Sequence, residues 1–156
     1  MSFVCGLCGK SGADNIHHKY TILCDECLVK QPPICDFCSA TDVKWRYEVE
    51  SFMVKDDPIA AMGGPANRSV ADWAACDECH ELIENEEYSK LTLRSVESSP
   101  GWKETAPAIK RRILEMLGGM HLQFIKGRLG PPTPEPTNPM TMEEKVARLR
   151  RMKEAK

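Results

Sequence analysis

All eight cysteines of this 156-residue chain fall into Cys-x-x-Cys pairs. A disulfide framework does not require that spacing four times, whereas a tetrahedral zinc site is built from two such pairs. We therefore predict two zinc ions, each held by four cysteine thiolates. Rubredoxin-like iron sites use the same ligands, so iron is the alternative metal. The predicted ligands are Cys5, Cys8, Cys24, Cys27, Cys35, Cys38, Cys76 and Cys79.

Four pairs can be combined into two four-thiolate sites in three ways. Sequential grouping joins the first pair to the second and the third to the fourth. A cross-brace, as in RING or FYVE modules, joins the first to the third and the second to the fourth, and a nested grouping is the third possibility. The seven residues between Cys27 and Cys35 are more than a RING pattern allows, and "HHKY" is only faintly similar to the basic cluster of a FYVE module. The pairs alone leave these alternatives open.

Residues 1–31 form the first expected domain, a four-cysteine zinc module that ends before Pro32 and Pro33. Gly9 follows Cys8 directly, where a zinc knuckle needs a tight backbone turn. A segment this short cannot bury a stabilising core, because chains below about 40 residues usually need a metal or disulfides. We expect metal binding to supply most of its folding free energy, on the order of 10 kcal/mol.

Residues 32–98 form the second expected zinc module. Its "VKWRYEV" stretch alternates apolar and charged residues, as in a half-buried strand, and Leu82, Ile83 and Leu91 are placed to line one helix that starts near Cys79. The order knuckle, hairpin, knuckle, helix is typical of a treble clef or zinc ribbon. We therefore predict a small α+β fold with two zinc-stabilised modules followed by amphipathic helices. Three aromatic residues are expected to pack the core beside the second zinc and not to stack on bases: Trp45, Tyr47 and Trp73.

Residues 35–95 also resemble an uncharacterised family of small two-knuckle proteins from actinobacteria and their phages. The resemblance rests on "CDFCS", "WRY" with a later Phe52, "DWAACDECHELIE" and "LRS", about sixty of the 156 residues. Because such relatives lack an N-terminal pair of knuckles, the resemblance implies that Cys35, Cys38, Cys76 and Cys79 close on themselves, and hence sequential grouping. Ala71 stands where the family pattern has Gly, which affects the turn into Trp73 but not the ligands. The resemblance implies a fold and no activity.

Three further segments follow the modules. Residues 99–130 contain a predicted amphipathic helix over 105–129, which Gly118 and Gly119 can kink or divide. Residues 131–140 are rich in proline and are predicted to be an extended spacer. Residues 141–156 are predicted to form a basic helix, with Thr141 and Glu144 as its capping box. The apolar stripe of the first helix consists of Ile109, Ile113, Leu117, Met120 and Phe124.

Charge is distributed unevenly along the chain. Residues 1–102 carry nine Lys and Arg against seventeen Asp and Glu, whereas residues 103–156 carry twelve against six. An acidic zinc-bearing part is a poor match for phosphates, which are bound through cations. We therefore expect a non-enzymatic zinc adaptor that binds a protein partner, including basic nucleic-acid-associated machinery such as a polymerase or ribosome. The alternative is a nucleic-acid-binding regulator whose contacts are Lys110, Arg111, Arg112, Arg148, Arg150 and Arg151.

No enzyme activity is expected, because four thiolates leave no open position on zinc. Adjacent His17 and His18 suggest an HNH-like nuclease, but the expected Asn and His on the following helix are missing from "CDECLVKQPP". His80 is expected to cap or face solvent, and His121 to be a partly buried helix residue. The chain starts on a cysteine motif without a leader and has no apolar run of roughly 18 residues, so we expect a cytoplasmic protein, in the host cytoplasm if a phage encodes it.

Overall fold

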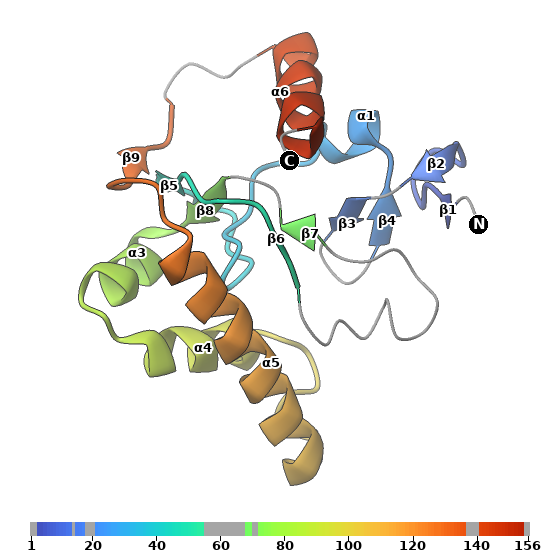
Figure 1. Cartoon of the computed structure of the whole chain (residues 1–156). Coiled ribbons are helices and arrows are strands. Elements are labelled where there is room, and N and C mark those ends of the chain that lie inside the picture. The colour runs from blue at the N-terminus through green and yellow to red at the C-terminus, as the bar shows by residue number, and fades with distance from the viewer. Residues whose placement is uncertain are drawn as a thin grey trace.

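The computed structural model describes residues 3–13, 15–17, 21–54, 68–69, 72–136 and 141–154. The N-terminal module consists of two antiparallel hairpins and a short helix (Figure 1). Its small core contains only Cys5, Ala13, Leu23 and Cys27 as buried residues among those described. Its elements are β1 (Phe3–Val4), β2 (Ser11–Ala13), β3 (Asn15–His17), β4 (Thr21–Leu23) and α1 (Asp25–Leu28).

The second module combines short antiparallel strands with three helices. Strands β5 (Trp45–Tyr47), β8 (Trp73–Ala75) and β9 (Thr133–Pro134) form one sheet in the order β8-β5-β9. A separate hairpin pairs β6 (Phe52–Met53) with β7 (Arg68–Ser69). The helices are α3 (Asp77–Glu84), α4 (Tyr88–Glu97) and α5 (Pro107–Lys126).

Helix α5 belongs to the core of the second module. The ring of Phe124 packs against the rings of Phe37, Trp73 and Tyr47, with centroid distances of 5.1, 4.9 and 5.4 Å. All four residues are buried, which confirms that Tyr47 and Trp73 are core residues. The segment that follows the two modules in sequence is therefore part of the second module's packing.

The predicted α5 helix forms with two differences. It begins with Pro107 in its first turn and runs without a break through Gly118 and Gly119 to Lys126. Its predicted apolar stripe holds at Phe124 but fails at Ile109, which is 53% exposed. The N-terminal end of α5 extends past α4, so none of the described helices and strands lies against the first turns of α5 (Figure 1).

The single helix expected from Cys79 to Leu91 is also a wrong prediction, because the structure has α3 and α4 there. The chain turns between them, with Glu86 at φ 58°, a left-handed conformation that an α-helix cannot contain. Ile83 and Leu91 are nevertheless buried in the same core. The apolar pattern was correct, while the turn that divides it was not recognised.

The chain returns from α5 along β5. The backbone N–H of Leu129 donates to the carbonyl of Glu48 at 3.0 Å, and the N–H of Glu50 donates to the carbonyl of Gly127 at 2.8 Å. Gly127 suits this close approach, since an added Cβ would lie 3.1 Å from a methyl group of Val49, which would have to move. The first part of the proline-rich segment then pairs with β5 as β9, so this part is attached to the sheet.

The C-terminal helix α6 (Met142–Glu154) lies beside α1 (Figure 1). The predicted capping box forms, because the backbone N–H of Thr141 donates to the Glu144 carboxylate at 2.7 Å and the N–H of Glu144 donates to the Thr141 hydroxyl at 3.2 Å. Among the helices in the described part of the chain, none is long and apolar enough to cross a membrane.

Candidate metal centres

The eight thiols gather into two clusters in the sequential grouping. Within each cluster the four sulfur atoms lie within 4.8 Å of one another. The Sγ atoms of Cys8 and Cys24 are 3.7 Å apart, and so are those of Cys38 and Cys76. Zinc–sulfur bonds of about 2.3 Å in a tetrahedron place sulfurs about 3.8 Å apart. Each cluster therefore fits one four-coordinate metal ion. The clusters are Cys5, Cys8, Cys24 and Cys27, and Cys35, Cys38, Cys76 and Cys79.

The first cysteine pair of each cluster forms the same backbone turn. The N–H of Cys5 donates to the carbonyl of Lys10 at 2.8 Å, and the N–H of Cys35 donates to the carbonyl of Ala40 at 2.7 Å. The residue after the second cysteine is left-handed in both turns: Gly9 has φ 74° and Ser39 has φ 63°. The prediction of a tight turn at Gly9 is confirmed, and Ser39 takes the equivalent position without glycine's conformational freedom.

One more hydrogen bond is repeated in both modules. The residue after the first cysteine donates its N–H to the carbonyl of the residue two before the third cysteine. These bonds run from Gly6 to Ile22 and from Asp36 to Ala74, each 2.9 Å long. Because each bond joins the turn to the strand that leads into the second pair, it brings the two halves of each ligand set together.

The second pair of each cluster begins a helix. Cys24 and Cys76 are the N-caps of α1 and α3, and both have extended φ and ψ angles. Cys27 and Cys79 then lie in the first helical turn, at the positive end of the helix dipole. The helix dipole by itself stabilises a thiolate at that position and so contributes to metal binding.

The two clusters differ in exposure. All four thiols of the second cluster are buried, whereas in the first cluster Cys8 is exposed and Cys24 is half-buried. Four thiols this close cannot all ionise without a cation. The pKa of Cys79 is raised by its hydrogen bonds with Cys35 and Cys38 and then by burial. A bound divalent ion would remove this conflict by compensating the negative charge of the thiolates.

Arg94 of α4 lies beside the second cluster. Burial lowers the pKa of Arg94, but hydrogen bonds with Cys79 and the charge of Cys38 raise it more strongly, so the pKa is higher than usual. The guanidinium also pairs with Glu78 of α3. Arg94 was not recognised from the sequence, because it comes fifteen residues after Cys79 and only the packing of α4 on α3 brings it to the thiols.

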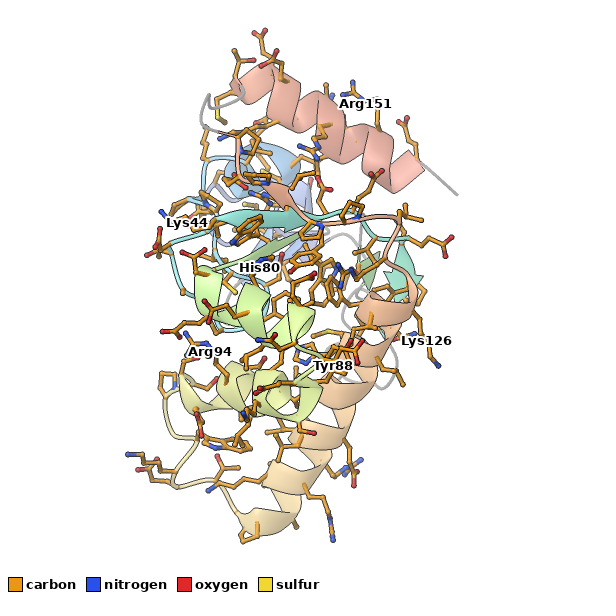
Figure 2. All side chains as sticks on the ribbon, turned by 90° about the vertical axis from the view of Figure 1, so that its left-hand side faces the viewer. Lys44, His80, Tyr88, Arg94, Lys126 and Arg151 are labelled. Carbon is orange, nitrogen blue, oxygen red and sulfur yellow. The ribbon has the colours of Figure 1, made fainter. Side chains whose placement is uncertain are left out.

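A polar network joins β5 to α3, the helix that carries His80 (Figure 2). Nδ1 of His80 lies within hydrogen-bond distance of the Tyr47 hydroxyl oxygen, at 2.7 Å, and the His80 ring stacks on Trp45 with a centroid distance of 3.9 Å. The Tyr47 hydroxyl also donates to Glu84 at 3.2 Å, and Arg128 pairs with the same carboxylate at 3.0 Å. His80 is thus a packing residue and is not among the thiol clusters.

His121 is more buried than predicted, with only 1% of its surface exposed. Its Nδ1 lies 3.0 Å from the Thr92 hydroxyl, and its Nε2 has no hydrogen-bond partner within the described residues. Burial lowers the pKa of His121 to about 4, so the imidazole is neutral at pH 7. Its place between Phe37 and Trp73 makes it part of the core.

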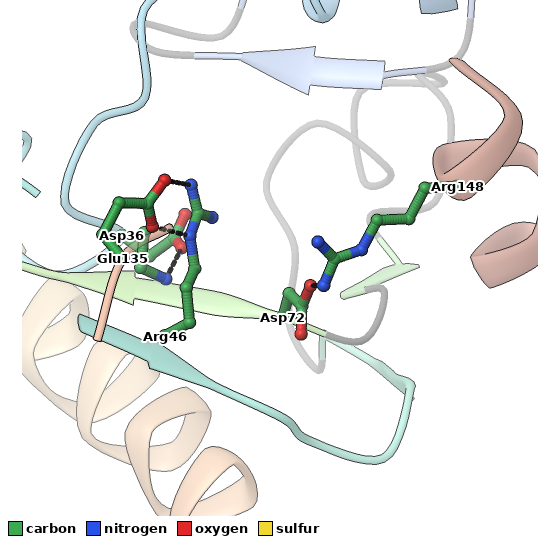
Figure 3. A network of polar contacts seen from close by, with 6 residues as sticks. Asp36, Arg46, Asp72, Glu135 and Arg148 are labelled. Atoms are coloured by element: carbon green, nitrogen blue, oxygen red, sulfur yellow. Dashed lines mark hydrogen bonds and ion pairs between the residues drawn. The ribbon is translucent and has the colours of Figure 1, made fainter. Parts of the chain in front are cut away.

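The structure divides the predicted basic contacts into two groups. Arg148 pairs with Asp72 (Figure 3), and Arg150 lies 3.8 Å from Asp25, so α6 uses these cations within the chain. Lys110 donates to the carbonyl of Lys103 at 3.0 Å and lies over the ring of Trp102. Within the described part of the chain, the remaining three make no ion pair: Arg111, Arg112 and Arg151.

The nuclease hypothesis depends on residues about which little is described. His17 ends β3, but its side chain lies outside the described residues, as does the whole of His18. Comparison of the chain with protein-family models, curated proteins and solved structures finds no match.

Proposed function

We propose that this protein is a non-enzymatic zinc-binding adaptor whose two modules are of the treble-clef or zinc-ribbon type. One observation carries the proposal: the eight thiols close into two complete four-ligand sets. Four protein ligands leave no coordination position for a water nucleophile, so such a centre is structural. Zinc is proposed over iron because it suits tetrahedral thiolate sites without redox chemistry, although the ligands also accept iron.

A surface for protein partners is supported by charge. Helices α1 and α3 both carry two acidic residues in the first turn and no basic residue in the last. With two dianionic zinc–thiolate centres added, the modules attract basic proteins and repel nucleic acid. The partner proposed here is therefore a basic protein, including one that is itself bound to nucleic acid.

Metal analysis tests the zinc part of the proposal. We expect two zinc ions per full-length chain and one in Cys76→Ser, because this substitution removes a ligand from the second centre only. Cys24→Ser is the matched variant for the first centre and should also retain one ion. Loss of both ions in either variant, or iron in place of zinc, would contradict the proposal.

Affinity capture tests the adaptor part. The full-length tagged chain and a Cys5→Ser/Cys35→Ser chain are compared, and a partner of the zinc-ordered surface should be recovered with the first chain only. Subsequent binding of the purified partner to the full-length chain should weaken with salt, since the proposed contact is between charges. A partner that binds both chains equally would contradict an adaptor built on the zinc modules.

A second candidate function is nucleic-acid binding through Arg111, Arg112 and Arg151. Arg111 and Arg112 are exposed on the projecting end of α5, and Arg151 is on the side of α6 that faces away from the modules (Figure 2). Such cations can contact phosphates, with an affinity that falls steeply with salt. Arg111→Ser/Arg112→Ser should then weaken binding to an oligonucleotide, and absence of any binding at low salt would exclude this function.

A further inference from the structure

Helix α6 contacts each of the two modules through an ion pair. Arg148 hydrogen-bonds to Asp72, which stands immediately before β8 of the second module (Figure 3). Arg150 approaches Asp25, the first residue of α1 in the first module. The side chains of Asp72 and Asp25 are only 15% and 22% exposed, whereas those of Arg148 and Arg150 are 41% and 62% exposed. The two acids thus belong to the surfaces of the modules, and the two arginines of α6 lie on top of these surfaces.

The packing of α6 on this surface is shallow. None of the described side chains of α6 is buried, and Val146 and Leu149 are only half-buried. Met142, which starts the helix, is 40% exposed. An open groove remains between α1 and α6, lined by Glu26, Lys30, Met142, Val146, Ala147 and Arg150. The Arg150–Asp25 pair is long and its arginine is exposed, so this pair contributes about 1 kcal/mol or less to the attachment of α6.

The acidic side of the contact is fixed independently of α6. Asp72 has φ 152°, a conformation imposed by the turn into β8, and the next residue, Trp73, is buried in the core. Asp25 follows Cys24, a predicted metal ligand and the N-cap of α1. Both carboxylates therefore remain in place when α6 leaves, and Asp72 then lacks the cation of Arg148.

The short connection between β9 and α6 keeps α6 close to the surface that it contacts. Glu135 forms two hydrogen bonds with Arg46 of β5, so the chain is anchored up to this residue. Five residues, 136–140, separate it from the capping residue Thr141, so the six Cα–Cα steps from Glu135 to Thr141 span at most about 22 Å. A short tether of this kind gives an effective concentration in the millimolar range. A soluble ligand must compete with that concentration.

We propose that the surface around Asp25 and Asp72 is a docking site for a basic amphipathic helix of the partner protein, and that α6 occupies it in the free protein. This inference rests on the proposed adaptor function and specifies both its partner and its control. The ligand is a helix whose two arginines, two positions apart, flank a stripe of small or medium apolar residues, as Arg148 and Arg150 do in α6. Nucleic acid does not fit, because its phosphates would meet two carboxylates.

A labelled peptide of residues 141–156 is the probe for this site, and its binding to full-length chains is measured by fluorescence anisotropy. Arg148→Glu/Arg150→Glu in the full-length chain should free the site by repulsion from the two acids. With an effective concentration of about 1 mM and a peptide Kd of about 0.1 mM, freeing the site should raise the apparent affinity about tenfold over wild type. Adding Asp25→Asn and Asp72→Asn should abolish this gain, because Asn has nearly the same shape as Asp and removes only the charge.

Arg111→Glu/Arg112→Glu is the matched control, since it makes the same charge change away from the site and should leave affinity at the wild-type level. The proposal is overturned if the freed chain binds the peptide no better than wild type, if the Asn substitutions do not matter, or if an oligonucleotide competes for the same site. All chains are checked for two zinc ions. If a chain binds two zinc ions but not the peptide, only the docking site is contradicted. If the chain does not bind zinc, the proposed function is contradicted.

Discussion

The two thiol clusters share their local structure and differ in what surrounds them. Both use the same turn at the first pair, the same linking hydrogen bond and a helix N-terminus at the second pair, where the sequence is "CDEC" in each case. In the first module the core consists of four small or medium residues, two of them ligands. In the second module the ligands lie against an aromatic core that includes Tyr47, Trp73 and Phe124.

This difference in surroundings distinguishes two properties of a metal site: which residues bind the metal, and how stable and accessible the site is. The local motif determines which residues coordinate the metal, and it needs only about six residues around each pair. The surroundings determine how much of the module survives without metal and how easily the ion is reached. Because Cys8 is exposed and the core is small, the first module would depend more on a bound metal ion, and shield it less, than the second.

Removal of metal should reveal the largest difference between the two modules. A chelator should take the ion from the first centre before the second, since Cys8 is accessible, and residues 3–28 should then unfold because metal supplies on the order of 10 kcal/mol of their stability. Absorbance of a zinc dye gives the release rates, and NMR spectra assign the unfolding. Simultaneous release of both ions, or earlier release from the second centre, would show that exposure does not control retention.

Arg94 should contribute to the stability of the second centre alone. Replacing it by Gln removes the cation that compensates the thiolates of Cys79 and Cys38, and partners of metal ligands typically change affinity by 10- to 100-fold. Competition with a chelator of known affinity should show this loss at the second centre and no change at the first. Arg94→Lys is the matched variant and should recover part of the affinity. An equal loss at both centres would point to general destabilisation.

His121 should make the second module sensitive to mild acid. Its pKa is lowered by burial to about 4 from an ordinary value near 6.5, so protons bind the unfolded chain more readily. Stability is therefore fully present above pH 6.5 and falls as pH decreases toward 4, by about 1 kcal/mol between pH 7.5 and 5.5. Denaturant unfolding should show this slope in wild type and lose it in His121→Gln. A slope that persists in the variant would assign it to the thiols.

Sequence reasoning was most accurate where a feature depends on neighbouring residues. The tight turn at Gly9 and the capping box of Thr141 with Glu144 both formed as predicted. Sequence reasoning failed where the environment of a residue depends on segments that are distant in sequence. The exposure of Ile109 depends on how far α5 extends beyond α4, and Arg46 reaches Glu135 across 89 residues. No local pattern encodes either relation.

The same limit applies to the candidate metal centres. Every thiol was found from the Cys-x-x-Cys spacing, because the two cysteines of each pair lie on one turn of the backbone. Grouping the pairs required either the family resemblance or the structure, since spacing alone leaves three combinations. Arg94 and the two acids that hold α6 were missed, because a single Arg or Asp carries no signal until a fold brings it to its partner.

The smallest predicted effect compares equivalent positions of the two turns. Ser39 and Gly9 have φ of 63° and 74°, and left-handed conformations cost a non-glycine residue roughly 1 kcal/mol. Ser39→Gly should therefore stabilise the second module by up to about 1 kcal/mol, and Gly9→Ser should destabilise the first by a similar amount. No atom lies within 4 Å of a Cβ added at Gly9, so this cost is in the backbone and not in packing. Thermal unfolding of both variants at equal zinc concentration gives the two signs. If both substitutions destabilise, the Ser39 side chain makes a contribution that outweighs its strain, and the two turns are not energetically equivalent.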